Sequence, residues 1–362
     1  MRWSIPIVRL FGIRVRLHVT FLLFVGWVAL DQGLLAGHFA RAGLAVALAL
    51  LAFSCVVLHE LGHALAARRF GIATRDIVLL PIGGVARLER MPERPGQEIL
   101  VAIAGPAVNV AIAAALALAI AFSGRPTDFA RFGDGLLESL LIINLLMLAF
   151  NLIPAFPMDG GRVLRALLAL RLPYVQATRV ASGVGQGAAV LLGAAGVYFL
   201  HNWMLALVAA FVFLAARDER TMVQSRASLR GLPVRAAMLT DFRALETQDP
   251  LRRAVGFLMT GSQQDFPVIE AGGLRGVLTR AGLAAALERR GLDAPVGEAM
   301  DPDPCGAAAD EPLEDAVARL RGRGRATAPV LDQGRVVGLL TVDNVGDLLL
   351  VREALRRHAA GL

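Results

Sequence analysis

Two histidines and a glutamate stand close together in the segment His59-Glu60-Leu61-Gly62-His63. In an α-helix, residues four apart lie on one face and one turn apart, so both imidazoles can reach a single metal ion. Zinc suits this pair, with each nitrogen about 2.0–2.1 Å from the ion. Glu60 lies about 100° around the helix, near enough to act on a water molecule at the metal. The spacing therefore predicts metal-assisted chemistry.

The surroundings of this segment are strongly apolar, because it follows the run Leu44-Ala-Val-Ala-Leu and continues as Ala64-Leu-Ala-Ala. A charged side chain inside a membrane span costs roughly 2.5 kcal/mol or more, and ionisable groups there mark functional sites. The residues His59, Glu60 and His63 are therefore expected to form a functional site inside a membrane.

A third ligand is needed, because catalytic zinc sites usually have three protein ligands. Asp159 is the candidate, in the segment that runs from Asn151 to Arg162. Pro154 and Pro157 break a helix, and the following glycines let the backbone turn, so a carboxylate here can be aimed inward. The alternative for Asp159 is a capping role in a loop beside the membrane.

The composition of the chain argues against a wholly soluble protein. Of 362 residues, 56% are hydrophobic and 19% are charged, whereas soluble domains have about 25% charged residues. The net charge of +7 arises from residues 1–216, with 17 Arg and 10 acidic residues, while residues 217–362 have 20 of each. A nucleic-acid partner is excluded, because its binding would need this excess in the soluble part. The distant Cys55 and Cys305 exclude a disulfide framework.

Six apolar runs approach the roughly 20 residues that a membrane span needs. They are Leu17–Leu35, Leu44–Ala67, Ile99–Phe122, Leu136–Phe156, Val180–Leu200 and Trp203–Ala216. Fourteen of the 17 Arg then lie on one side, and Arg41, Arg125 and Arg131 lie on the other. The positive-inside rule predicts a multi-pass protein of the bacterial inner membrane with both termini cytoplasmic. Whether residues 180–216 form two spans or one stays open.

Residues 217–362 contain an internal repeat. A shift of 62 positions overlays residues 231–291 on 293–353 without a gap. Among the matched pairs are Met238 with Met300, Pro250 with Pro312, Pro267 with Pro329, Gly276 with Gly338 and Thr279 with Thr341. Each copy is predicted to form a helix, two strands joined by a glycine turn, and a second helix. The expected fold is an α-helical polytopic membrane domain (1–216), a linker (217–230) and a cytoplasmic α/β pair (231–291 and 293–354).

The repeat resembles a pair of cystathionine-β-synthase (CBS) domains. The resemblance implies an adenine nucleotide in the cleft between the copies, with Thr279, Thr341 and Asn344 as binding candidates. The family pattern has an Asp three residues after each hydroxyl residue, where this chain has Gly282 and Asn344. A pair that serves only in packing or homodimer formation is the alternative.

The membrane part, over residues 10–216, resembles the site-2 protease family of intramembrane zinc metalloproteases. The resemblance rests on His59-Glu60-x-x-His63 together with Asn151-x-x-Pro154-x-x-Pro157-x-Asp159-Gly-Gly. It implies one Zn²⁺ held by His59, His63 and Asp159, with Glu60 as the general base. A bacterial subgroup of the family carries a C-terminal CBS pair. Its substrates are expected to be membrane proteins such as anti-sigma factors or membrane-tethered transcription factors.

Four further residues are candidates for contacting the substrate or the oxyanion. Asn151 is a candidate donor, with an interhelical hydrogen bond as the alternative, and Asn109 is a weaker candidate for which a structural role is favoured. Gly83 and Gly84 belong to an extended segment, residues 77–86, that could pair with an unwound substrate by β-augmentation. The alternative is a loop that lies at the membrane interface.

The alternative functions for the whole chain are a CBS-regulated transporter or channel and an inactive scaffold. A CBS-regulated transporter or channel would need a polar path across the bilayer, but the spans have few ionisable groups beyond one edge. An inactive scaffold is disfavoured because His59, Glu60, His63 and Asp159 are all present. The sequence leaves open which protein is cleaved, which nucleotide binds, and the oligomeric state.

Overall fold

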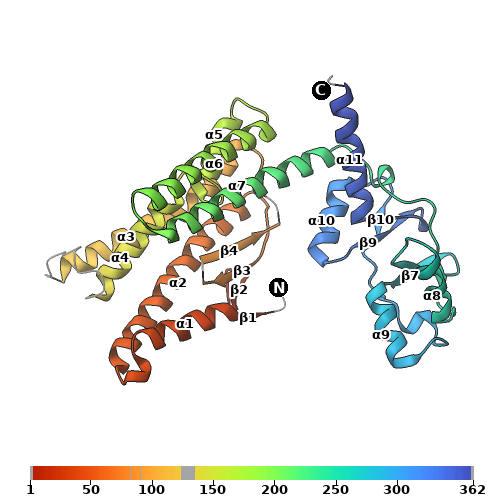
Figure 1. The fold of residues 1–362 in the computed structure, drawn as a ribbon, viewed down its shortest axis with the longest axis horizontal. Helices are drawn as coiled ribbons and strands as arrows, with labels where there is room; N and C mark the ends of the chain where they lie inside the picture. Colours follow the sequence, from red (N-terminus) through yellow and green to blue (C-terminus); the bar gives the residue numbers. More distant parts are fainter. Residues whose placement is uncertain (1–2, 82, 90, 124–134, 360–362) are drawn as a thin grey trace. The chain divides into compact units, whose positions relative to one another are not determined.

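A computed structural model describes the protein except for residues 1–2, 82, 90, 124–134 and 360–362. The chain divides into two compact units, Met1–Val223 and Gln224–Leu362. Figure 1 shows their elements along the chain. Arg2, Arg90, Arg125 and Arg131, which enter the charge asymmetry, lie outside the described residues.

The first unit contains a four-stranded sheet in the order β1-β2-β3-β4. Its strands are β1 (Ser4–Leu10), β2 (Ile13–His18), β3 (Thr74–Leu80) and β4 (Gly83–Leu88). The β2–β3 pair is parallel and the other two pairs are antiparallel. Of the extended segment predicted at residues 77–86, residues 77–80 and 83–86 are confirmed as parts of the antiparallel strands β3 and β4, and residue 82 lies outside the described residues. Strands β1 and β2 were not predicted.

Three helices among the described residues are long and apolar enough to cross a membrane. They are α2 (Phe39–Arg68), α3 (Pro95–Phe122) and α6 (Tyr174–Tyr198). Two shorter apolar helices, α1 (Val19–Asp31) and α4 (Leu136–Asn151), fall in the first and fourth predicted spans. Helix α7 (Trp203–Leu229) begins with the sixth predicted span and continues beyond it. A count of six spans therefore stays a prediction.

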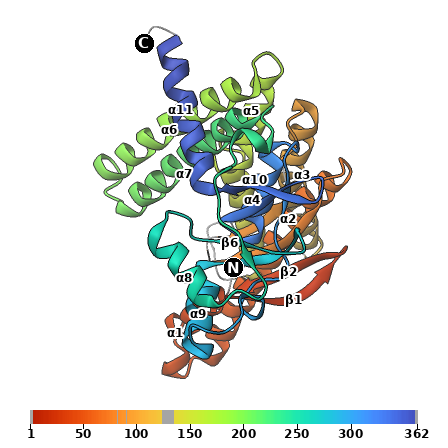
Figure 2. The ribbon, with the colours of Figure 1, turned by 90° about the vertical axis from the view of Figure 1, so that its right-hand side faces the viewer.

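The first and fourth predicted spans are shorter in the structure than in the sequence analysis. Leu17 and His18 belong to β2, and His18 caps α1 by accepting a hydrogen bond from the Thr20 amide. Helix α4 ends at Asn151 and not at Phe156, because Pro154 and Pro157 cannot continue a helix. Residues 152–158, here called the proline bend, connect α4 to α5 (Asp159–Ala169). Helices α5 and α6 lie side by side in both views (Figures 1 and 2).

The second unit has two three-stranded sheets, β5-β6-β7 and β10-β9-β8. The first copy has β5 (Leu245–Glu246), α8 (Leu251–Thr260), β6 (Phe266–Glu270), β7 (Gly273–Leu278) and α9 (Arg280–Arg290). The second has β8 (Ala307–Ala308), α10 (Leu313–Arg323), β9 (Thr327–Asp332), β10 (Arg335–Thr341) and α11 (Val342–Ala359). The predicted helix–strand–strand–helix repeat is confirmed.

The contacts between the two copies include a pair of equivalent β-bridges. Val277 bridges to Asp301, and Leu339 bridges to Leu239. The two bridges are related by the same 62-residue shift as the sequence repeat, since Val277 corresponds to Leu339 and Leu239 to Asp301. The two buried apolar clusters of this unit each combine residues of both copies. The second unit is therefore a pseudo-symmetric pair.

Candidate active site

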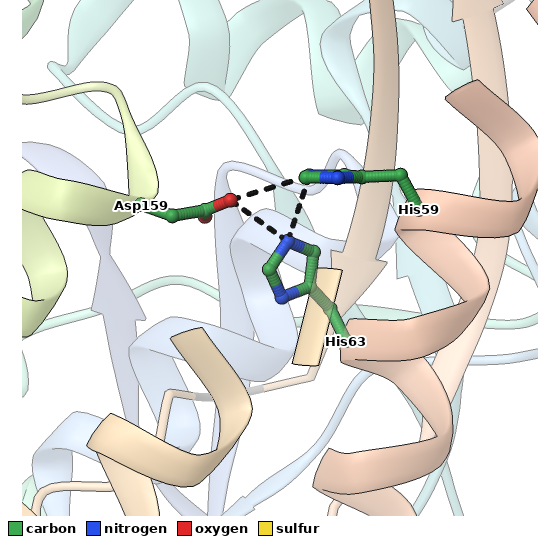
Figure 3. A group of neighbouring side chains, drawn as sticks. All are labelled: His59, His63 and Asp159. Carbon is green, nitrogen blue, oxygen red and sulfur yellow. Dashed lines mark hydrogen bonds and ion pairs between the residues drawn. The ribbon is translucent and has the colours of Figure 1, made fainter. Parts of the chain in front are cut away.

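His59 and His63 project from α2 towards Asp159, the first residue of α5 (Figure 3). The Nε2 atoms of the two histidines lie 3.1 Å apart. The Oδ2 atom of Asp159 lies 3.2 Å from Nε2 of His59 and 3.0 Å from Nε2 of His63. All three side chains are buried. The structure therefore brings together two segments that lie 96 residues apart in the sequence.

These three atoms have the separation that a tetrahedral metal ion requires. Bonds of about 2.0–2.1 Å at tetrahedral angles place neighbouring ligand atoms about 3.3 Å apart. The three measured separations, 3.0–3.2 Å, are close to that edge length. Two imidazole nitrogens and one carboxylate oxygen also form a donor set that zinc binds in proteins. The residues present therefore fit a zinc ion.

The hydrogen bonds of His63 also favour a cation at this position. Nδ1 of His63 lies 2.7 Å from the carbonyl oxygen of Val101, which can only accept a hydrogen bond. Nδ1 therefore carries the proton, and in the neutral ring Nε2 is left with a lone pair. That lone pair faces the carboxylate of Asp159. A positive ion would relieve this repulsion between two acceptors, and the Val101 carbonyl would fix the ring orientation, as partners of metal-binding histidines commonly do.

The Asp159 carboxyl lies outside the three candidate spans, and the neighbouring groups strongly shift its pKa. Burial raises its pKa, but the adjacent imidazoles of His59 and His63 and the Arg162 guanidinium more than offset this effect, so the pKa lies well below its usual value. Arg162, one turn further along α5, adds a contact of 3.5 Å to Oδ1. Asp159 is therefore held as a carboxylate, which is the form that binds a metal.

Helix α3 approaches the two histidines so closely that only glycine fits. A Cβ atom at Gly105 would lie 2.2 Å from Nε2 of His63 and 2.7 Å from Nε2 of His59. Similarly, a Cβ atom at Gly62 on α2 would lie 2.7 Å from the carbonyl oxygen of Ala104. These two glycines allow α2 and α3 to pack at the level of the site. The sequence alone did not predict this contact.

Glu60 lies beside the histidines and contacts β4. Its Oε2 atom accepts a hydrogen bond of 2.9 Å from the backbone amide of Ala86. Gly84 lies two residues earlier on β4, where an added Cβ atom would be 2.8 Å from Cγ of Glu60. Of the two candidate glycines, Gly84 therefore packs on Glu60, while Gly83 begins the strand with a φ of 137°. The contact with the Ala86 amide was not predicted, since a backbone donor has no residue-type signature.

The other candidate residues of the membrane part lie on α3 and α4. Asn151 is the last residue of α4 and is half-buried, directly before the proline bend. Asn109 is fully buried on α3, one turn beyond Gly105, and neither polar atom of its amide has a hydrogen-bond partner among the described residues.

The candidate nucleotide-binding residues occupy helix-capping positions in the CBS pair. The hydroxyl of Thr279 accepts a hydrogen bond of 3.0 Å from the Gly282 amide at the start of α9. The hydroxyl of Thr341 accepts one of 3.1 Å from the Asn344 amide and donates to the Asn344 side chain. These contacts give the three residues a local role that stabilises the helix starts.

Comparisons with known proteins bear on both units. Residues 46–137 match the model of peptidase family M50, and residues 296–350 match that of the CBS domain. A zinc metalloprotease of Methanocaldococcus jannaschii is 33% identical over 278 residues, covering 77% of this chain and 78% of the relative. The protein Rip3 of Mycobacterium tuberculosis is 29% identical over 373 residues, covering 96% of this chain and 93% of Rip3. A solved site-2 protease from M. jannaschii is 36% identical, with a TM-score of 0.44, covering 60% of this chain and 95% of that one.

The site and these matches together define a zinc metalloprotease. More particularly, the chain belongs to peptidase family M50, the site-2 protease family, and also contains a CBS domain. The predicted enzyme class is confirmed, in preference to a transporter or channel.

Proposed function

We propose that the protein is an intramembrane zinc endopeptidase that cleaves the membrane-spanning segments of regulatory proteins. The observation that carries the proposal is the His59–His63–Asp159 group with Glu60 beside it, on a helix apolar enough to span a membrane. His59 lies 20 residues after the start of α2, which is about 30 Å along the helix. The site would then lie near one face of a bilayer whose apolar core is about 30 Å thick, where water can reach it.

In this proposal His59, His63 and Asp159 hold one zinc ion, and Glu60 is the general base. A zinc ion held there would lower the pKa of a water molecule to about 7 and would polarise the scissile carbonyl. Glu60 takes the proton of the attacking water and then passes it to the leaving amine. The Ala86 amide orients the Glu60 carboxylate through its hydrogen bond to Oε2.

The substrate is proposed to bind along β4, which is the edge strand of the four-stranded sheet next to α2. A substrate helix hides its carbonyl groups in backbone hydrogen bonds, so it must unwind before cleavage. An unwound segment can pair with an exposed strand edge by β-augmentation. The close contact between Gly84 and Glu60 would then bring the paired backbone next to the catalytic group. Asn151 is proposed to donate a hydrogen bond to the oxyanion or the substrate backbone.

The test separates metal binding from chemistry. Glu60→Gln should keep about one zinc per chain and lose cleavage by about 10²- to 10⁴-fold, because it removes the base but no ligand. His59→Ala should lose both. Metal analysis of the purified variants, with a comparison of membrane proteomes from cells carrying either form, would also reveal substrates such as anti-sigma factors. Cleavage that persists in Glu60→Gln would refute the assignment.

We further propose that the CBS pair regulates the protease, with an adenine nucleotide as the candidate ligand. The supporting feature is the pseudo-symmetric pairing of the two copies, but both threonine hydroxyls already make capping contacts. Calorimetry on the whole protein with ATP, ADP and AMP tests binding, and cleavage with and without the nucleotide tests coupling. An absence of heat from all three would favour packing or dimer formation as the role of the pair.

A further inference from the structure

A buried ionic group lies close to the metal site in sequence but plays no part in the proposed chemistry. Its centre is Arg165 on α5, six residues after Asp159. Arg165 has the largest fully buried side chain among the described residues. Nε of Arg165 lies 2.7 Å from Oε1 of Glu98 on α3, and Nη1 lies 2.5 Å from Oε1 of Glu219 on α7. One guanidinium therefore connects three helices.

Two aromatic rings complete the surroundings of this guanidinium. Its central carbon lies 5.0 Å from the ring centres of both Phe156 and Tyr174. Phe156 belongs to the proline bend, three residues before Asp159. Arg165 therefore contacts the bend that precedes Asp159 while it is itself part of the helix that follows.

The proline bend and the start of α5 are also packed tightly against each other. A Cβ atom at Gly161 would lie 2.6 Å from the backbone of Ala155 and 2.7 Å from that of Phe156. At Gly160 it would lie 2.4 Å from the carbonyl oxygens of Leu152 and Ile153. With so little free space, a displacement of the bend would move the start of α5, and Asp159 with it.

The choice of arginine also suits a positioning role. Its planar fork can bind two carboxylates and stack on aromatic rings at the same time, whereas lysine is a single point charge. Removing one partner of a buried ion pair is strongly unfavourable, because the remaining charge stays buried without compensation. Glu98, which is fully buried, would be left in that state by the loss of Arg165.

We propose that Arg165 is a positioning residue for the metal ligand Asp159. By binding Glu98, Glu219 and the ring of Phe156, it holds the proline bend and α5 so that the Asp159 carboxylate stays against His59 and His63. This inference rests on the proposed zinc site, and its readout is the affinity and geometry of that site, not proteolysis.

The experiment measures the zinc dissociation constant of the full-length protein in detergent by chelator competition. Arg165→Gln should weaken zinc binding about 10- to 100-fold, the usual effect of losing a residue that supports metal ligands. Arg165→Lys should recover part of this loss, because lysine keeps the positive charge but lacks the planar guanidinium that binds two carboxylates at once. The visible spectrum of the Co²⁺-substituted protein should also change in Arg165→Gln, reporting altered ligand geometry.

The control is Ile120→Ala, which removes a buried side chain at the far end of α3, away from the metal site. It should lower the thermal midpoint without changing zinc affinity or the Co²⁺ spectrum. If Arg165→Gln kept the wild-type affinity and spectrum, or if Ile120→Ala weakened zinc equally at the same loss of midpoint, the positioning role would be wrong.

A second variant keeps the test decisive if Arg165→Gln does not fold. Glu219→Gln leaves Arg165 bound to Glu98, and it should weaken zinc several-fold and shift the Co²⁺ spectrum; unchanged values would overturn the inference. Failure of the proposed function is seen separately, as a wild-type protein that binds zinc but shows no Glu60-dependent cleavage. A wild-type protein that binds no zinc would overturn both.

Discussion

At the scale of single residues, the absence of a side chain at Gly105 is as important to the site as the ligands themselves. We expect Gly105→Ala to weaken zinc binding by about tenfold or more, because the added methyl group would overlap Nε2 of both histidines. Metal analysis after dialysis against a chelator measures this loss. The matched control is Gly96→Ala on the same helix, where the methyl group meets no other atom within 4 Å. Equal zinc content in both variants would contradict the role of Gly105.

Glu60 gives a second prediction at this scale, through its contact with β4. Gly84→Ala would place a methyl group 2.8 Å from Cγ of Glu60. We therefore expect near-normal zinc content but cleavage slowed by about tenfold or more, since a base that moves away from its substrate loses part of its contribution. Zinc content and cleavage rate measured on one preparation separate the two effects. A variant that lost zinc and activity together would show that β4 supports the ligands instead.

The sequence predicted His59, His63 and Asp159 as partners because their residue types are distinctive and a proline–glycine break can aim a carboxylate. The carbonyl of Val101 and the amide of Ala86 could not be predicted, since every residue carries these backbone groups. Arg165 was counted only as one positive charge near a membrane face. Its two carboxylate partners come from helices whose packing the sequence does not specify.

At the scale of elements, the long apolar helices and the repeated α/β units were predictable from periodicity and apolar length. Strand β1 was missed because its residues do not alternate between buried and exposed positions. Strand β2 does alternate apolar residues with arginine from Ile13 to Arg16, so this signal could have been found. The fourth predicted span was extended through Pro154 and Pro157, although proline does not continue a helix. The apolar character of residues 152–156 concealed the end of α4.

The contact between the two CBS copies gives a prediction at this scale. A Cβ atom at Gly276 would lie 2.5 Å from the carbonyl oxygen of Asp301, and at the equivalent Gly338 it would lie 2.7 Å from that of Leu239. Either alanine substitution should destabilise the pair by about 1–3 kcal/mol, as overpacking commonly does. Protease resistance of residues 224–362 in the whole protein measures the effect. Gly256→Ala on α8, which has open space, should be neutral or slightly stabilising.

At the scale of the whole molecule, the distribution of arginine predicts how the protein lies in the membrane. Fourteen of the 17 Arg in residues 1–216 fall on one side of the six-span arrangement. The chain after Leu229, the last residue of α7, should therefore lie in the cytoplasm. A reporter of cellular location fused at this point should give its cytoplasmic signal and no periplasmic signal. The control is a fusion at Arg41, which should be active only outside. Periplasmic activity after Leu229 would mean an odd number of spans.

The ionic group around Arg165 has a consequence for the biogenesis of the protein. Its three charges leave the ribosome in the order Glu98, Arg165 and Glu219, more than 120 residues apart from first to last. Glu98 is therefore made long before its cation has been translated, and a carboxylate that must be buried without its partner is unfavourable. Nascent chains that end before residue 165 should be prone to degradation, and the final arrangement of the metal site must await the arrival of α5 and α7. The protease would thus mature only after nearly two thirds of the chain has been made.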